Sequence, residues 1–167
     1  MKALVVVSGP VASGKTSLAV PLAERLDLPL LAKDTVKEAL FDALGTGGED
    51  WSERLGAAAY AVLWALAARF PAALLEANFG ARDVERLRSL CDRPVQVHCT
   101  GPPAELERRF AARERHPGHV DDEYPRGRTD QARPLELGGP LLVVDTTADV
   151  DVDAVAAWVS EQLSEVA

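Results

Sequence analysis

The first residues of the chain that could do chemistry form the stretch GPVASGKT, from Gly9 to Thr16. Their spacing matches G-x-x-x-x-G-K-[ST], in which Gly14 and Lys15 are the second glycine and the lysine. Glycines let the backbone wrap closely around an anion and point N–H groups at it. The lysine of such a loop reaches the β- and γ-phosphates of a nucleotide, and the hydroxyl after it binds Mg²⁺. The stretch therefore predicts a site for ATP or GTP with Mg²⁺, formed by Gly9, Ala12, Ser13, Gly14, Lys15, Thr16 and Ser17.

The residues on either side of this loop support that interpretation. Residues 4–7 are a continuous apolar run, as expected of a strand buried on both faces. After the loop, Leu18, Leu22 and Leu26 recur at helical spacing. A strand before the motif and a helix after it are the context in which the motif is specific. An ordinary glycine turn with a chance lysine is therefore disfavoured.

The rest of the chain alternates between the two kinds of element. We expect further strands at residues 28–32, 72–77, 94–99 and 141–144. We expect further helices at residues 35–44, 51–70, 83–91, 102–115 and 150–166. This alternation predicts an α/β fold, a parallel sheet with helices on both faces, in one domain over residues 1–167. Residues 116–139 are too long and polar for a simple connection, so we expect a lid-like segment around residues 109–134.

An aspartate follows the second expected strand. Asp34 lies at the carboxyl end of that strand, where open α/β sheets bind ligands. Thr35 and Glu38 match a T-x-x-E capping box, which would leave Asp34 just outside the helix and facing the cleft. A carboxylate there can accept the proton of a substrate hydroxyl as it attacks the γ-phosphate. The alternative is that Asp34 only caps the helix. Lys37 either contacts the substrate or lies on a solvated helix surface.

Two polar residues lie at the end of the third expected strand. Glu76 and Asn78 are two positions apart, so they share a face of the strand. A carboxylate in an otherwise apolar strand needs a partner. Three roles for Glu76 stay open at this point: it holds Mg²⁺ through water, it binds substrate with Asn78, or it is a hydrogen-bonded structural acid.

The stretch ELERRFAARERHPGH is rich in arginine and leads into the polar segment. Arg109 and Arg113 are four residues apart and are expected on one face of a helix. Two guanidinium groups on a movable lid can bridge phosphates during transfer. Part of the stretch also fits an ordinary solvated face, because Glu105 can pair with Arg109. Arg115 and His116 are predicted substrate contacts. A metal site is the weaker alternative; it would use His116, His119, Asp121 and Asp122.

Composition limits the partners and the location. The net charge is −8, which argues against a nucleic-acid partner because backbone binding needs clustered cations. The longest apolar run, residues 57–68, is shorter than the ~18 residues of a membrane-spanning helix. Cys91 and Cys99 are expected to be reduced thiols. We therefore expect a cytoplasmic protein without a signal peptide, membrane contact or obligate protein partner.

Six stretches together resemble a known family. They are the P-loop at 9–16, KD at 33–34, EANF at 76–79, RRFAAR at 108–113, RHPGH at 115–119 and VVDTT at 143–147. They resemble the small AAA-type P-loop kinases, which include chloramphenicol phosphotransferase, zeta toxins and the kinase module of polynucleotide kinases. The resemblance covers nearly the whole chain and implies the sheet order 2-3-1-4-5. It also implies that Asp34 is the base, that Arg109 and Arg113 contact the transferring phosphate, and that Thr146 lies near the nucleotide base. Residues 45–54 and 117–134 match no single member's substrate pocket.

The expected function is therefore an ATP-dependent kinase that moves the γ-phosphate to a hydroxyl of a small molecule. A GTPase switch is disfavoured because the chain has no N-K-x-D and its D-x-x-G, residues 42–45, ends a helix. A nucleoside or nucleotide kinase is the alternative enzyme. A nucleotide-binding regulatory ATPase with slow hydrolysis is the alternative from another class, and it would not need a free acid at Asp34.

Overall fold

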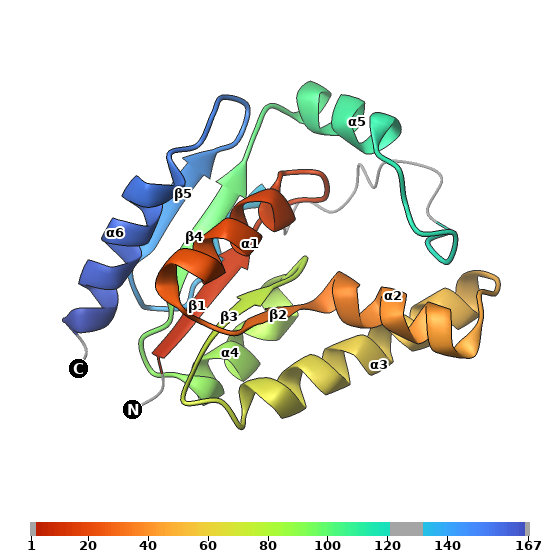
Figure 1. Cartoon of the computed structure of the whole chain (residues 1–167), viewed down its shortest axis with the longest axis horizontal. Helices are drawn as coiled ribbons and strands as arrows, with labels where there is room; N and C mark the ends of the chain where they lie inside the picture. Colours follow the sequence, from red (N-terminus) through yellow and green to blue (C-terminus); the bar gives the residue numbers. More distant parts are fainter. Residues whose placement is uncertain (1–2, 121–131, 166–167) are drawn as a thin grey trace.

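The computed structural model describes residues 3–120 and 132–165, which form a parallel sheet flanked by helices (Figure 1). In this described part of the chain the strands are β1 (Ala3–Ser8), β2 (Leu30–Ala32), β3 (Ala72–Glu76), β4 (Val95–Thr100) and β5 (Leu141–Asp145). They form one five-stranded sheet in the order β2-β3-β1-β4-β5, and every neighbouring pair is parallel. The predicted fold class and the strand order implied by the family resemblance are both confirmed.

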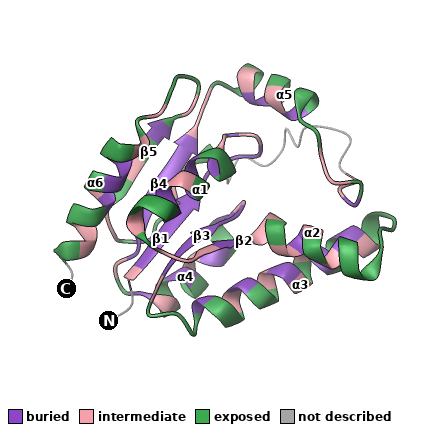
Figure 2. Cartoon of the chain, viewed as in Figure 1, coloured by how far each residue is buried: buried purple, intermediate pink, exposed green. Residues whose placement is uncertain are grey.

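Helices cover both faces of this sheet. They are α1 (Lys15–Leu26), α2 (Lys33–Leu44), α3 (Glu49–Ala67), the 3₁₀ turn η1 (Ala81–Asp83), α4 (Val84–Leu90), α5 (Pro103–Ala112) and α6 (Val152–Ser164). Val5 and Val7 of β1 pack in a core with α1 and α6. Leu4 and Val6 point the other way, into a core with α3 and α4. The buried strands therefore form the middle layer in Figure 2, and a strand covered on both faces must be apolar throughout.

Helices α2 and α3 form a hairpin at the end of the sheet. α2 begins directly after β2, and α3 runs back alongside it (Figure 1). The hairpin begins to turn at Gly45, whose φ of 86° ends α2 in a conformation that suits glycine. The Lys37 ammonium donates a hydrogen bond of 2.8 Å to the Ser52 hydroxyl, and both residues are buried. This contact ties the two helices together at the edge where the strands end.

Two predictions, the lid-like segment and the absence of membrane contact, can be compared with the structure only over its described residues. Residues 121–131 of the expected lid, and with them Asp121 and Asp122, lie outside the described residues. Within the described residues, no helix is both long enough and apolar enough to cross a membrane.

Candidate active site

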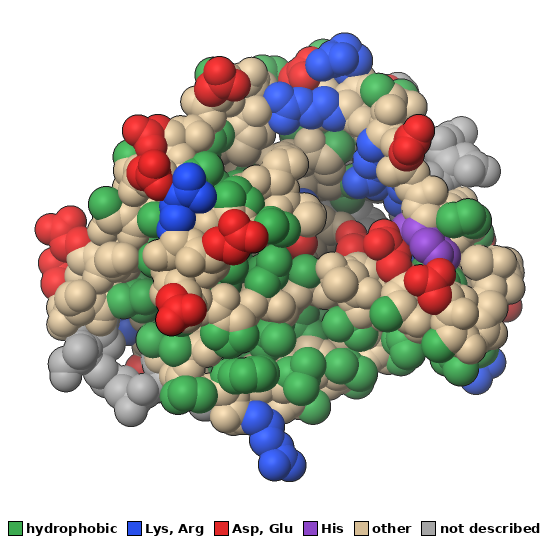
Figure 3. Space-filling model, viewed as in Figure 1, with side chains coloured by type: hydrophobic (Ala, Val, Ile, Leu, Met, Phe, Trp, Pro, Cys, Tyr) green, Lys and Arg blue, Asp and Glu red, His purple; other side chains and the backbone are tan. Residues whose placement is uncertain are grey.

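A cavity of about 1190 Å³ lies across the carboxyl ends of the strands. One end is lined by the P-loop and the start of α1, which we call the nucleotide end. The other is lined by α2, α3, Asn78, Arg82 and four residues after α5, which are Arg113, Arg115, His119 and Val120; we call it the acceptor end. In the space-filling view the hollow lies between α5 and the body of the protein, with Lys and Arg side chains along its upper rim (Figure 3).

The P-loop connects β1 to α1 through unusual backbone angles. Gly9 has a φ of 142°, and a Cβ atom there would collide with the Cys99 carbonyl oxygen. Gly14 has a φ of 73° and is the N-cap of α1. Ala12 also has a positive φ, 62°, which costs a non-glycine residue some strain. Such strain is typical of ligand-binding loops. Residues 12–17 all line the cavity, whereas Gly9 does not.

Lys15 is the first cation inside this loop. Its side chain is buried, and its Nζ donates a 2.7 Å hydrogen bond to the Pro10 carbonyl oxygen. Burial lowers the pKa of Lys15, while the charge of Glu76 opposes that shift. The lysine is therefore positioned by the loop itself, at the place where the motif expects the β- and γ-phosphates.

Thr16 and Glu76 form the part of the site that suits a metal ion. The Thr16 hydroxyl donates a 3.2 Å hydrogen bond to Glu76 Oε2, and Glu76 is only 4% exposed. Burial raises the pKa of this carboxyl group, and the charge of Lys15 lowers it to a smaller extent. The described residues contain no cluster of three or more His, Cys, Asp or Glu side chains that could hold a metal ion. A hydroxyl and one carboxylate fit Mg²⁺, which usually takes one or two carboxylates and completes its shell with phosphate oxygens and water.

Asp34 lies inside α2, and the predicted capping box is wrong. α2 begins at Lys33, and its N-cap, Ala32, makes no side-chain capping bond. Glu38 instead lies 3.1 Å from His119 Nε2. The sequence pattern failed because β2 runs into α2 without the connecting residue that a cap would need.

The Asp34 side chain nevertheless lines the cavity and is ionised at neutral pH. Its Oδ1 accepts a 2.7 Å hydrogen bond from Lys33 Nζ. Burial acts to raise its pKa, but the charge and hydrogen bond of Lys33, with smaller effects of His119 and Lys15, hold the pKa below its ordinary value. A carboxylate of this kind can accept a proton from a hydroxyl group.

Lys37 and Asn78 both line the cavity as well. Lys37 is 7% exposed, so the solvated-surface alternative is wrong, and its Nζ lies 5.2 Å from the centroid of the Phe41 ring. Strand β3 ends at Glu76, so Asn78 lies beyond the strand rather than on a shared strand face. The Asn78 carbonyl oxygen accepts a hydrogen bond of 3.3 Å from the Tyr60 hydroxyl.

The two lid arginines do not share a helical face, contrary to the prediction. α5 ends at Ala112, and Arg113 has an extended backbone with φ −79° and ψ 138°. Arg109 pairs with Glu105 at 2.8 Å and also donates a 2.8 Å hydrogen bond to the Thr146 carbonyl oxygen. Thr146 in turn donates a 2.9 Å hydrogen bond to the Ser13 carbonyl oxygen of the P-loop. Arg109 and Thr146 therefore lie at the nucleotide end, and Arg113 lines the cavity farther along the chain.

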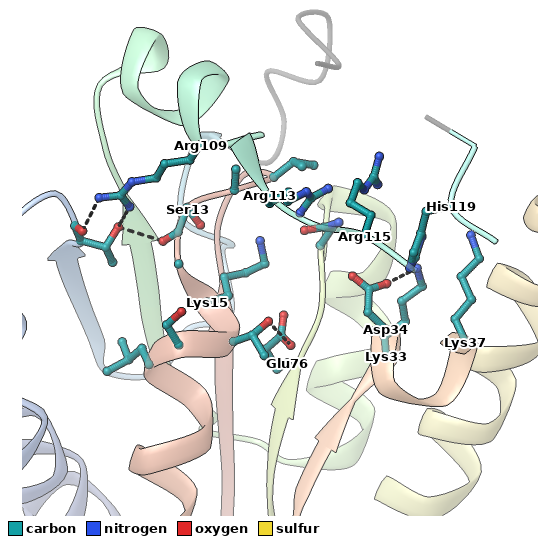
Figure 4. Close-up of a pocket in the computed structure, with 18 of the residues that line it drawn as sticks. Ser13, Lys15, Lys33, Asp34, Lys37, Glu76, Arg109, Arg113, Arg115 and His119 are labelled. Atoms are coloured by element: carbon teal, nitrogen blue, oxygen red, sulfur yellow. Dashed lines mark hydrogen bonds and ion pairs between the residues drawn. The ribbon is translucent and has the colours of Figure 1, made fainter. Parts of the chain in front are cut away.

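The structure separates the predicted substrate contacts Arg115 and His116. Arg115 lines the cavity, whereas His116 does not; its ring stacks on Phe41 and its Nε2 lies 3.1 Å from Asp42 Oδ1. His119 lines the cavity instead. In Figure 4, Arg113 and Arg115 lie above Lys15 and Glu76. Asp34, His119 and Lys37 lie to the right in the same view.

The sequence analysis did not predict that α3 forms one wall of the cavity. A stripe of polar or small residues with helical spacing faces the cavity on this helix; its members are Glu49, Ser52, Glu53, Gly56, Ala57 and Tyr60. The neighbouring stripe of the same helix is apolar and buried and includes Leu55, Ala59 and Leu63. The spacing of the polar stripe is readable in the sequence, but only the fold shows that it faces a cavity rather than water.

Comparisons with known proteins identify the family of this chain. The AAA domain family matches residues 4–134. A candidate kinase from Chloroflexus aurantiacus J-10-fl has 39% sequence identity and a TM-score of 0.89, over 96% of this chain and 98% of that one. No curated protein matches the sequence.

Two more distant solved structures share the fold. A gluconokinase from Sinorhizobium meliloti 1021 has 20% identity and a TM-score of 0.54, over 99% of this chain and 93% of that one. The APS kinase of Mycobacterium tuberculosis has 19% identity and a TM-score of 0.60, over 98% of each chain. With the P-loop, the sheet order and the length of the family match, the chain belongs to the AAA domain family and is one of its small P-loop kinases.

Proposed function

We propose that this kinase transfers the γ-phosphate of ATP to a hydroxyl group of a small polar molecule, with Mg²⁺ as the cofactor. One observation carries the proposal: the P-loop and the ionised Asp34 line the same cavity from different sides. A protein that only binds nucleotide has no need of a carboxylate held ionised across from the P-loop lysine. A kinase needs one to receive the proton of the acceptor hydroxyl.

In the proposed transfer, groups of this chain can accept the proton and bind the phosphates. The acceptor oxygen bonds to the γ-phosphorus, its proton passes to Asp34, and the bond to the bridging oxygen breaks so that ADP leaves. Lys15 and the N–H groups of the P-loop would hold the phosphates, and Arg113, which lines the same cavity, would contact them from another side. Thr16 and Glu76 would hold Mg²⁺, which neutralises charge on the β- and γ-phosphates when it is bound.

The size of the cavity supports two ligands. A single small-molecule pocket is typically about 300–1,000 Å³, and this cavity is about 1190 Å³. The Mycobacterium tuberculosis APS kinase, which has the same fold, holds AMPPNP and APS in one complex. The gluconokinase and a shikimate kinase of this fold are likewise named for small molecules. The acceptor end, lined by lysines, arginines, hydroxyls and carboxylates, suits a polar acceptor.

A screen for phosphate transfer tests this proposal. The protein is incubated with ATP and Mg²⁺ and with pools of sugars, sugar acids, polyols, nucleosides and antibiotics, and mass spectrometry detects any compound that gains one phosphate. Asp34→Asn, run in parallel, should not form the product. Transfer to a nucleoside alone would support the nucleoside-kinase alternative. If no pool accepts phosphate and none raises ATP turnover above its basal rate, the regulatory ATPase is the better description.

A further inference from the structure

The chain after α5 returns to α2 through a tight turn. In residues His116 to His119, the His119 amide donates a 2.9 Å hydrogen bond to the His116 carbonyl oxygen. The Gly118 amide donates a 3.1 Å hydrogen bond to His116 Nδ1. These bonds fix the shape of the turn, so it can pack against another element as one unit.

That element is α2, and the contact centres on Phe41. The His116 ring lies parallel to the Phe41 ring, with centroids 5.4 Å apart and an interplanar angle of 7°. The His119 ring meets Phe41 edge-on, with centroids 5.8 Å apart. A Cβ atom on Gly118 would overlap the Phe41 ring, so only glycine allows this approach. Phe41 is 1% exposed, so the contact with the turn lies in a buried environment.

Two carboxylates on α2 hold the same turn from either side. Asp42 Oδ1 lies 3.1 Å from His116 Nε2, and Glu38 Oε1 lies 3.1 Å from His119 Nε2. Glu38, Phe41 and Asp42 occupy positions i, i+3 and i+4 of the helix, so they present one surface. The turn therefore meets one ring between two acids, an arrangement that fixes both its position and its orientation.

The other end of this segment is also attached. Arg109 binds Thr146, which binds the P-loop. Between the two attachments, the guanidinium carbons of Arg113 and Arg115 lie 4.7 Å and 4.9 Å from the centroid of the Phe110 ring. Both arginines line the cavity that also contains Asp34, as Figure 4 shows. Residues 109–119 thus cross the cavity with both ends attached and two arginines between.

We propose that Phe41, His116 and Gly118 form a clasp that positions Arg113 and Arg115 relative to Asp34 for phosphoryl transfer. α2 carries both Asp34 and the Phe41 surface, so seating the turn on Phe41 sets the arginines at a defined place with respect to the base. Phosphoryl transfer depends mainly on positioning and on neutralising charge, and an error of ~1 Å can lower a rate by about 10²-fold. The catalytic role of the clasp rests on the proposed function, but the geometry of the clasp can be tested without an acceptor.

Gly118→Ala is the central test, because it adds one methyl group where the Phe41 ring lies. Gly48→Ala is the matched control, since a Cβ atom there meets nothing within 4 Å. We expect Gly118→Ala to lower kcat for ATP turnover about 10-fold, with the KM for ATP, the affinity for AMPPNP with Mg²⁺ and the Tm close to those of the wild type. Trypsin should cut after Arg113 and Arg115 about 10-fold faster, as mass spectrometry of the fragments would show. A kcat and a cleavage rate equal to those of Gly48→Ala would overturn the proposal.

Two further comparisons separate positioning from general packing. His116→Phe keeps a ring on Phe41 and should retain most of the activity, whereas His116→Ala should resemble Gly118→Ala. Phe41→Ala combined with Gly118→Ala removes the overlap, so the two effects should not add. Additive losses, or equal activity of His116→Phe and His116→Ala, would contradict the clasp. If the wild type phosphorylates no acceptor at all, the proposed function fails, while ATP turnover and cleavage still decide the clasp.

Discussion

The nucleotide end of the cavity is formed by one contiguous stretch of the sequence, whereas the acceptor end is formed by several separate segments. At the nucleotide end, residues 9–17 are contiguous, and backbone angles at Gly9, Ala12 and Gly14 set the shape. At the acceptor end, α2, α3, Asn78 and the chain after α5 come together only through the fold. The difference explains why a motif can identify the nucleotide and leave the acceptor open.

The electrostatics of the two ends differ in the same way. Burial dominates at the nucleotide end, where it lowers the pKa of Lys15 and raises the pKa of Glu76. At the acceptor end the pKa of Asp34 is lowered, because Lys33, His119 and Lys15 outweigh the effect of burial. One end therefore needs a charged ligand to offset the effect of burial, while the other already holds an ionised carboxylate, the proposed base. Variants of each end should consequently fail in different measurements.

The largest loss is expected for Lys15→Ala. The variant removes the buried cation that the motif directs at the β- and γ-phosphates, so both ATP binding and turnover should suffer. Turnover should fall by at least ~10³-fold, and calorimetry should show weaker binding of AMPPNP with Mg²⁺. Arg86→Ala, which removes a cation from the exposed side of α4, is the control and should behave like the wild type. Normal affinity and normal turnover in Lys15→Ala would end the P-loop assignment.

Asp34→Asn should lose chemistry while keeping nucleotide affinity. The amide preserves the shape of the side chain and removes its basicity, which typically costs about 10²–10⁴ in rate. The measurement is kcat for transfer to the acceptor found in the screen, with AMPPNP affinity measured beside it. Asp50→Asn, in the exposed first turn of α3, is the matched control. Wild-type transfer by Asp34→Asn would make Asp34 a structural residue.

Glu76→Gln should act on the requirement for Mg²⁺. Losing one carboxylate ligand should raise the Mg²⁺ concentration that supports half-maximal turnover about 10- to 100-fold. Burial raises the pKa of Glu76, so in the wild type this carboxylate becomes protonated, and holds Mg²⁺ less well, as the pH falls toward that raised pKa. The lowered pKa of Asp34 keeps the base ionised over the same range. Titrations between about pH 8 and about pH 5 should therefore show a rising Mg²⁺ requirement in the wild type and a flatter one in Glu76→Gln. Glu85→Gln, on exposed α4, should match the wild type at every pH.

These differences also define what the sequence can predict. The apolar run of β1 and the alternation of elements predicted the sheet, because a strand covered on both faces must be apolar. The P-loop was predictable because its function needs particular residues at fixed spacing. The place of Asp34 at the end of a strand predicted that it lines the cavity, although the expected capping box does not form.

The errors at Arg113 and His116 both involve contacts between residues far apart in sequence. Arg113 leaves the helical pattern because the chain after Ala112 turns toward α2, and no local signal marks that turn. His116 was expected in the site, but its ring stacks on Phe41, 75 positions away, and does not line the cavity. His119 lines the cavity instead. Helical periodicity describes a helix well and says nothing about the partner that its end must reach.

The smallest effects should distinguish arginines that are close together in the sequence. Arg113 lines the cavity and its charge acts on Lys15, whereas Arg108 is exposed and forms an ion pair with Glu105 at 2.7 Å. Arg113→Lys keeps the charge but loses the planar fork that can hold two phosphate oxygens, so kcat should fall at least ~10-fold. Arg108→Ala removes a surface ion pair, a kind of contact that contributes little to stability, so kcat should stay within about 2-fold.

Steady-state kinetics of both variants with the identified acceptor would measure this difference, and the order of the two effects matters more than their size. If Arg113→Lys were as mild as Arg108→Ala, the arginines after α5 would form a solvated surface. Charge neutralisation during transfer would then fall to Lys15 and the groups of the P-loop alone. If Arg108→Ala were the more damaging variant, the Glu105 pairing would be what holds Arg109 on Thr146, and the attachment of α5 to the P-loop would be the sensitive point. The expected result, a clear loss only at Arg113, places the sensitive arginine where the chain has already left the helix and crosses toward α2.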